Sequence, residues 1–356
     1  MKSAIYVIVQ ACLAAHAATV WPAPQHISSA GSSIELKANF AFKCKGPTLA
    51  AACDRYLTLL KSSGSFASQG LDAVDVVVAS SDETLFFGVD ESYTLTIANS
   101  TASISAPTLY GALHALETFS QLADNYGRVA TPHLAVPATL HISDAPRFAW
   151  RGLMIDVARR YYEVKFIEHI IDTMVASKLN VLHVHFTDDQ SFPVASTQWP
   201  KLSGAGAFRD AHGTPLTYTH DDLRRLVAFA TARGVILVPE FDMPAHTSAW
   251  RAGYPEYVTS GMYEPFSHGD ALRPDLDATY TFVDSLLGEL ASFFGTSEFR
   301  ESANLRRSCP GVRGLDCPSL LARLTPTMHA PPPQYTWVAT SCRRPRGWAT
   351  RASLPG

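Results

Sequence analysis

The 356-residue sequence has little net charge and few cysteines, and beyond its first residues it lacks any long apolar run. Lysine and arginine number 29 against 32 aspartates and glutamates, which gives a net charge of -3 and a pI near 6.5. A chain without a basic surplus has no electrostatic reason to bind nucleic acid. Since no later segment is long and apolar enough for a transmembrane helix, we expect neither a nucleic-acid nor a membrane partner.

The N-terminus is typical of a secretion signal. Lys2 precedes a mostly apolar run over residues 4–15, and Ala15-His16-Ala17 then offers a small-x-small cleavage pattern. The run is too short to cross a bilayer core of about 30 Å as a helix. A buried N-terminal strand is the alternative interpretation. We expect residues 1–17 to be a signal peptide of a secreted protein, with a lysosome- or vacuole-like compartment as the other destination.

Secretion would place the cysteines in an oxidising compartment. Cys12 would leave with the signal, and the five that remain are an odd number that needs an explanation. Cys44 and Cys53 are close enough in sequence to form a small disulfide loop. Asn99-Ser100-Thr101, the chain's single N-glycosylation sequon, lies between two strand-like runs, so Asn99 is a candidate glycosylation site.

Strands followed by a helix predict a compact α+β domain over residues 18–145. Residues 74–78 and 93–97 are rich in β-branched and aromatic residues, and residues 98–100 resemble the turn of a hairpin. Residues 109–122 carry leucine and phenylalanine at helical spacing. Asp144-Ala145-Pro146 is a plausible boundary.

From residue 146 the pattern changes to alternating strands and helices. Strands are expected at 148–156, 180–186 and 235–241, and helices at 164–179, from about 220, and at 280–294. The helix near residue 220 should begin with a capping box of Thr219 and Asp222 and stop at Gly234. This alternation predicts parallel strands joined by crossover helices.

Each of these three strands runs into acidic residues at its C-terminal end. The first strand ends at Asp156, the second at Asp188 and Asp189, and the third at Glu240 and Asp242. In a parallel β/α barrel this end is where loops deliver catalytic groups. Helix caps and solvated loops are the simpler explanation for a single acid. Three in series, with Arg159, His183, His185 and His246 nearby, favour a polar cleft.

The sequences of these segments resemble those of the family 20 glycoside hydrolases. These are the β-N-acetylhexosaminidases that remove terminal N-acetylglucosamine or N-acetylgalactosamine. The resemblance is carried by Phe148-Ala-Trp-Arg-Gly152, Asp156-Val-Ala-Arg159, the run from Lys178 to Asp189, and Pro239-Glu-Phe-Asp-Met-Pro-Ala-His246. The 93–97 and 110–122 segments also look like that family's N-terminal domain. The implied fold is an α+β N-terminal domain followed by an incomplete (β/α)8 TIM-type barrel, with residues 146–299 as its first half.

The resemblance also implies roles for three side chains. Arg159 corresponds to the arginine that grips hydroxyls of the terminal sugar, a role that suits the fixed donors of a guanidinium. Asp188 and His246 match an aspartate–histidine pair beside the catalytic acid, in which the aspartate orients the imidazole. The implied partners are terminal N-acetylhexosamine glycans or chitin oligomers, without a cofactor or metal, and the full-length relative could form a homodimer.

The family's mechanism is substrate-assisted: the acetamido oxygen attacks the anomeric carbon while a glutamic acid protonates the leaving oxygen. That glutamate and its partner aspartate follow a Gly-Gly pair at the end of the fourth strand, and no Gly-Gly-Asp-Glu occurs in this sequence. Residues 300–356 instead hold nine Arg, no Lys and eight Pro. They are expected to be either a disordered basic extension or a stretch translated out of the family's frame.

A complete barrel takes roughly 250 residues, so the 154 residues from 146 to 299 suffice for about four units. We therefore expect this chain alone to be inactive. Two alternatives stay open. A non-catalytic fragment could bind amino sugars through Arg159, Asp188 and His246. His183-x-His185 with Asp188 superficially fits a metal-dependent hydrolase, although core or second-shell histidines are favoured.

Overall fold

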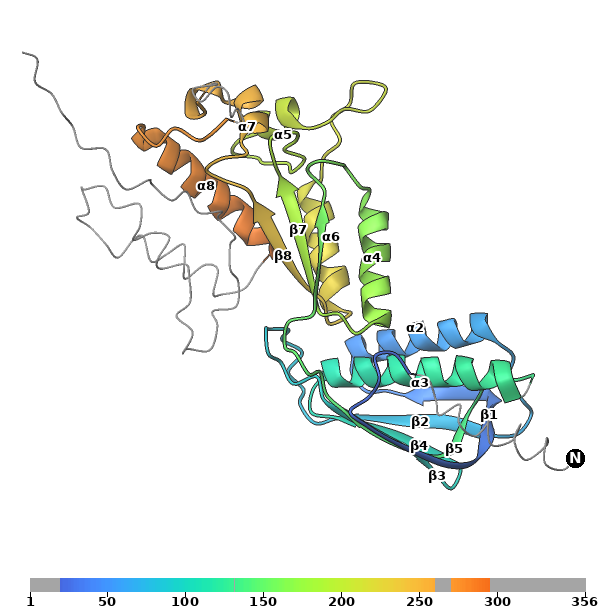
Figure 1. The fold of residues 1–356 in the computed structure, drawn as a ribbon. Helices are drawn as coiled ribbons and strands as arrows, with labels where there is room; N and C mark the ends of the chain where they lie inside the picture. The colour runs from blue at the N-terminus through green and yellow to red at the C-terminus, as the bar shows by residue number, and fades with distance from the viewer. Residues whose placement is uncertain (1–19, 131, 260–269, 295–356) are drawn as a thin grey trace, which may run out of the picture.

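The computed structural model describes residues 20–130, 132–259 and 270–294, which form two parts (Figure 1). A sheet covered by two helices makes up the first part, and parallel strands with helices make up the second. The predicted architecture, an α+β domain followed by part of a TIM-type barrel, is confirmed. The predicted signal peptide and tail lie outside the described residues. Within the described part, no helix has the length and apolar character needed to cross a membrane.

Five strands in the order β1-β2-β4-β3-β5 form the sheet of the N-terminal part. The 18-residue β1 pairs with β5 through its first half and with β2 through its second half, so the ring of hydrogen bonds closes. Helices α2 and α3 lie side by side against one face (Figure 1). The bounds are β1 His26–Lys43, α2 Pro47–Ser63, β2 Leu71–Val78, β3 Tyr93–Ala98, β4 Thr101–Ala106, α3 Leu109–Ala130 and β5 Ala135–Asp144.

The predicted hairpin turn joins β3 to β4. Asn99 and Ser100 both have positive φ angles, 50° and 59°, which is the backbone that a tight two-residue hairpin requires. Both residues are exposed, so the Asn99 side chain is accessible to solvent. The expected disulfide between Cys44 and Cys53 is also present and ties the end of β1 to α2.

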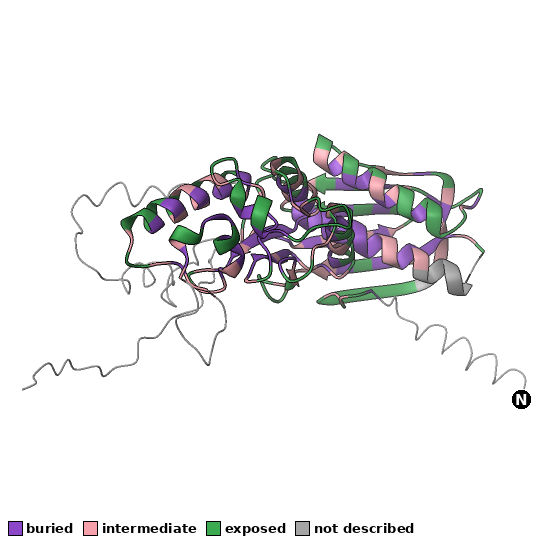
Figure 2. Cartoon of the chain, turned by 90° about the horizontal axis from the view of Figure 1, so that it is seen from above, coloured by how far each residue is buried: buried purple, intermediate pink, exposed green. Residues whose placement is uncertain are grey.

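The second part is a three-stranded parallel sheet in the order β6-β7-β8. Its main helices α4, α6 and α8 pack on one face, and Figure 2 shows that their buried residues are turned toward the strands. The bounds are β6 Gly152–Asp156, α4 Val164–Ala176, β7 Val181–Thr187, α5 Lys201–Gly206, α6 His220–Thr231, β8 Ile236–Phe241, α7 Ser248–Gly253, a 3-10 turn Pro255–Tyr257 and α8 Asp277–Phe294.

Some expectations from the sequence were wrong. Residues 148–151 are not strand, because the chain there crosses from one part to the other and Arg151 reaches back to Glu91. Helix α4 ends at Ala176, and Lys178 has a φ of 53° in the turn that follows. The described residues hold three strand–helix units, and the loops after β7 and β8 carry the short helices α5 and α7.

The two faces of the three-stranded sheet have different surroundings. Leu182, Val184 and Phe186 of β7 pack against the helices in the main core. On the opposite face, Val181 meets Ile236 and Val238, and Leu85 and Phe87 of the N-terminal part cover this apolar end. Because side chains alternate along a strand, His183 and His185 lie on this same face, further toward the C-terminal end. The site is built there.

Candidate functional site

Arg159 connects the ends of the first two strands. It follows β6, and its Nη1 donates to Asp156 Oδ2 at 2.7 Å while Nη2 lies 2.5 Å from Asp188 Oδ2 after β7. Asp188 is buried, whereas half of the Arg159 side chain is exposed. Burial disfavours the ionised form of Asp156, but hydrogen bonds from Arg159 lower the pKa of that carboxyl. The guanidinium is therefore fixed at one end and accessible at the other.

His246 brings the loop after β8 to the same aspartate. Its Nδ1 lies 3.2 Å from Asp188 Oδ1 and 3.4 Å from Asp189 Oδ2. The contact is close, but that nitrogen makes no aligned hydrogen bond with any described residue. His246 has a φ of 60°, an uncommon backbone for a histidine, in the turn that precedes α7. The structure thus brings together Arg159, Asp188 and His246 from three different strand ends.

A row of imidazoles and carboxylates lies beneath these residues. His183 Nε2 is 2.7 Å from Glu240 Oε2, and the same oxygen is 2.9 Å from His185 Nδ1. The other nitrogen of His185 hydrogen-bonds Asp188 Oδ2 at 2.8 Å. Burial opposes the charged form of His185, but hydrogen bonds to Glu240 and Asp188 raise the pKa of its imidazole to about 9. Burial opposes ionisation of Glu240 as well, and hydrogen bonds with both histidines lower its pKa to about 2.

Asp242 is a buried acid without a complete set of partners. Only 6% of its surface is exposed, and its Oδ1 is buried with no hydrogen-bond partner among the described residues. Burial raises the pKa of this carboxyl, and the electrostatic interaction with nearby His246 opposes the rise. Asp189 is placed differently, since its Oδ1 accepts from the backbone N–H and hydroxyl of Ser248 at the start of α7.

The predicted metal-type pattern has another explanation in the structure. Ligand atoms of His185, Asp188 and Asp242 lie within 4.8 Å of one another. However, both ring nitrogens of His185 face carboxylate oxygens, so neither offers a lone pair to a cation. His183 and His185 instead contact Glu240, and His185 also contacts Asp188, so the two histidines hold these carboxylates in place.

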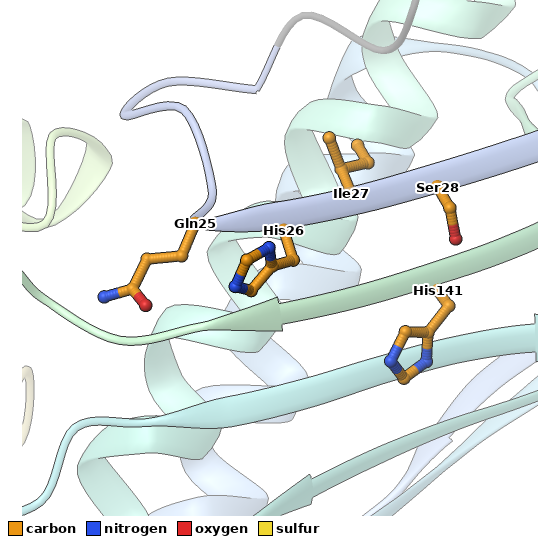
Figure 3. Close-up of a pocket in the computed structure, with 5 residues that line it drawn as sticks. All are labelled: Gln25, His26, Ile27, Ser28 and His141. Atoms are coloured by element: carbon orange, nitrogen blue, oxygen red, sulfur yellow. The ribbon is translucent and has the colours of Figure 1, made fainter.

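A separate shallow pocket lies on the N-terminal part. It is lined by Gln25, His26, Ile27, Ser28 and His141, on the start of β1 and on β5 (Figure 3). These residues lie on a different sheet from the strand ends of β6, β7 and β8. None of the side chains predicted for the site lines this pocket.

Two family models match the chain. The model of the glycosyl hydrolase family 20 catalytic domain matches residues 148–301, and a model described as beta-acetyl hexosaminidase like matches residues 20–122. The chain belongs to glycosyl hydrolase family 20. The first match begins four residues before β6 and contains Arg159, Asp188 and His246, so the strand-end cluster lies in this family's catalytic domain.

Curated relatives of this family 20 chain are β-hexosaminidases. Beta-hexosaminidase subunit A1 of Dictyostelium discoideum is 37% identical over 286 residues, which are 77% of this chain and 52% of that protein. The beta subunit of the Homo sapiens enzyme is 39% identical over 210 residues, 58% of this chain and 36% of its own length. The chain therefore spans about half the length of the relatives that it matches most extensively.

Solved structures give the same family. The Streptomyces plicatus N-acetyl-beta-hexosaminidase in complex with Thio-NAglucal superposes with a TM-score of 0.65 at 28% identity, over 81% of this chain and 62% of that one. The Flavobacterium johnsoniae chitobiase gives a TM-score of 0.65 at 27% identity, over 81% and 46% of the two chains. Both are glycoside hydrolases whose chains extend beyond the matched part.

Sequence reasoning placed the acidic strand ends but missed how they are connected. Glu240 was expected only as one more acid, and the structure makes it the partner of two histidines. The signal was present, because His-x-His on one strand and Glu-x-Asp on the next put polar groups on one face of neighbouring parallel strands. The contact itself depends on the register that pairs His185 with Glu240.

Proposed function

We propose that this chain carries the first part of the sugar site of a β-N-acetylhexosaminidase, which removes terminal N-acetylglucosamine or N-acetylgalactosamine from glycans or chitin oligomers. The observation that supports this is the meeting of Arg159, Asp188 and His246 at the C-terminal ends of three parallel strands. A half-exposed guanidinium that is anchored on the buried Asp188 and the partly buried Asp156 presents its remaining donors to hydroxyl groups. Family membership and the printed names of the relatives support the same substrate class.

The chemistry of the proposed reaction needs a proton donor for the leaving oxygen. The family's Gly-Gly-Asp-Glu motif does not occur in these 356 residues. We therefore expect the 356-residue chain alone to bind the amino sugar weakly, because half of a pocket surrounds the ligand poorly, and not to turn it over.

Two measurements on the purified chain test these statements. Saturation-transfer NMR with N-acetylglucosamine should give a signal that excess N-acetylgalactosamine competes away and that glucose does not. Release of nitrophenol from an aryl N-acetylglucosaminide should stay at the level of an empty-vector preparation. No binding at any concentration would contradict the proposed site, and turnover above the control would contradict the expected inactivity. Binding without turnover also fits a non-catalytic sugar-binding role for this chain.

Secretion and glycosylation are part of the proposal. The N-terminal pattern, the Cys44–Cys53 disulfide and the exposed Asn99 in a hairpin turn support an oxidising compartment outside the cytosol, or a lysosome- or vacuole-like one. Expression in a secreting eukaryotic cell should yield a chain whose mass falls after treatment with an N-glycosidase. An unchanged mass, with Asn99→Gln migrating like the wild type, would contradict glycosylation. Homodimer formation by the longer relative stays an expectation, which size-exclusion chromatography can test.

A further inference from the structure

The row of imidazoles and carboxylates behind the site has a fixed charge pattern. The order is His183, Glu240, His185, Asp188 and His246, and neighbouring groups are separated by 2.7, 2.9, 2.8 and 3.2 Å. It starts on β7, passes to Glu240 on β8 and back to β7, and ends in the loop after β8. Only its last member, His246, is substantially exposed. The other four are therefore shielded from bulk water to different degrees.

The position of His185 defines its charge. A neutral imidazole donates through one nitrogen and presents a lone pair at the other. Both nitrogens of His185 lie within 3 Å of a carboxylate oxygen, one from Glu240 and one from Asp188. A lone pair facing either oxygen would be repelled. His185 is therefore an imidazolium whose single positive charge is shared by two carboxylates.

That charge acts on Asp188. Asp188 Oδ2 is in contact with both the His185 ring and the Arg159 guanidinium, and Oδ1 accepts from the backbone N–H of Asp189 while it faces His246. Two cations on one side of a buried carboxylate reduce the negative potential on its other side. An isolated aspartate would hold a proton on His246 more strongly than this one does.

We propose that His185 is a positioning residue of the sugar site. Held as an imidazolium between Glu240 and Asp188, it orients Asp188 and weakens the pull of Asp188 on His246, and so sets the pH at which His246 exchanges its proton. This rests on the proposed role of Asp188 and His246 in that site. A histidine that can both release and accept a proton can exchange protons with a neighbouring acid, which one locked as a cation cannot do.

Several other charged groups surround Asp188 and His246 and contribute to the electrostatic potential at His246. They come from all three strand ends: Asp156 at the end of β6 with Arg159 after it, Asp189 after β7, and Asp242 after β8. His183 reaches the pair only through Glu240. Because these groups stay unchanged in a His185 variant, the difference between variant and wild type reports the charge of His185.

Histidine titration by NMR on the full chain tests the proposal without any ligand. With histidine labelled at Cε1, the His246 signal is assigned from the His246→Gln variant and followed against pH. His185→Gln should raise the His246 midpoint by roughly one pH unit, because it removes a nearby positive charge. The matched control is His169→Gln, the same substitution at an exposed site on α4, and it should leave that midpoint unchanged.

The charge of His185 in the wild-type chain supplies a second test, which does not require the His185→Gln variant to fold well. The His185 ring, assigned from its own variant or from its long-range contacts, should still be charged at about pH 8. Glu240→Gln should lower its midpoint by more than about one unit, because one of its two anionic partners is lost. A wild-type His185 that is neutral at about pH 7, or a His246 midpoint that moves by less than about half a unit in His185→Gln, overturns the proposal.

Failure here and failure of the proposed function are distinguishable. If His246 does not respond to His185 but N-acetylglucosamine still binds, the sugar site stands without this role for His185. If the titrations behave as expected and no sugar binds, the imidazolium is real and the assignment of the site is wrong.

Discussion

His185 and Glu240 are charged side chains that are largely buried, so their contributions to the free energy of unfolding depend on pH. His185 has a pKa of about 9 against an ordinary value of 6.5, and Glu240 has one of about 2 against 4.5. Because the pKa of His185 is raised in the folded state, its charged form stabilises the fold. This contribution is complete below pH 6.5 and is lost as pH rises through about 9. A depressed carboxylate pKa stabilises the fold fully above 4.5 and ceases to do so as pH falls through 2.

Both contributions are complete together only between about pH 4.5 and 6.5. We expect the Tm of the wild type to exceed that of Glu240→Gln by most in this range, and the difference to shrink as pH rises through about 9, where His185 loses its charge in the wild type. Thermal unfolding monitored by circular dichroism across this range measures the difference. Glu256→Gln, at an exposed position, is the control and should show a small difference at every pH. A Glu240→Gln difference that does not vary with pH would contradict the assignment.

Arg159 is the side chain on which proposed sugar recognition depends most directly. Arg159→Gln should weaken N-acetylglucosamine binding by about tenfold, since hydrogen bonds from a charged donor are among the stronger ones in a binding site. Stability should also fall, because the buried carboxylate of Asp188 loses one of its cationic partners, so binding is compared at a temperature where both proteins are folded. NMR titration with the sugar measures the change. Arg224→Gln on α6, an exposed arginine paired with Asp221, should bind like the wild type, and equal affinity for both variants would refute the role of Arg159.

At the scale of elements, helices α4, α6 and α8 hold the strands through one apolar core, and their ends are defined locally. Helix α6 begins with the predicted capping box: the Thr219 hydroxyl accepts from the Asp222 backbone N–H, and the Asp222 carboxylate accepts from the Thr219 backbone N–H. Helix α8 is fastened differently, through Glu289, which accepts from Ser196 and Thr197 in the loop after β7. Glu289 thereby fixes that loop to α8.

The capping box gives a prediction for the element. Thr219→Ala should lower the free energy of unfolding by about 1 kcal/mol, because two backbone donors at the start of α6 lose a partner or its support. Urea unfolding measures the change. Thr173→Ala is the matched control, since Thr173 is exposed in the body of α4 and its hydroxyl bonds only the carbonyl of Ile170. Equal losses in the two variants would show that the cap has no special contribution.

At the scale of the whole molecule, the two parts are joined by buried charges as well as by apolar contacts. Arg151 donates to both oxygens of the buried Glu91 at 2.7 and 3.0 Å, and Asn180 and His114 also contact that carboxylate. Burial disfavours ionisation of Glu91, but hydrogen bonds from His114 and Arg151 lower its pKa. The N-terminal part is thereby fixed to the base of the strands whose other ends carry the site.

Breaking this junction should destabilise the protein strongly. Arg151→Gln should lower the free energy of unfolding by about 3 kcal/mol, because a buried carboxylate is left without its main partner. The double variant Glu91→Gln/Arg151→Gln should recover part of that loss, since it removes the stranded charge. Arg224→Gln, which breaks an exposed pair, should change it by less than about 0.5 kcal/mol. Similar values for Arg151→Gln and Arg224→Gln in urea unfolding would argue against a contribution of this junction to stability.

Local patterns in the sequence determined the elements that depend on neighbouring residues. Richness in β-branched and aromatic residues predicted β2 and β3, helical spacing predicted α3, α4 and α8, and the Thr219–Asp222 spacing predicted a cap, because each signal rests on residues close together in the sequence. The same reasoning missed β1 and β5, which pair with each other across more than a hundred residues of sequence, and it also missed α2. The motifs placed acids at three strand ends. Only the tertiary structure decided that His185 lies between Glu240 and Asp188 and that Asp242 has an unpaired oxygen, because strand register and the packing of separate loops fix those distances.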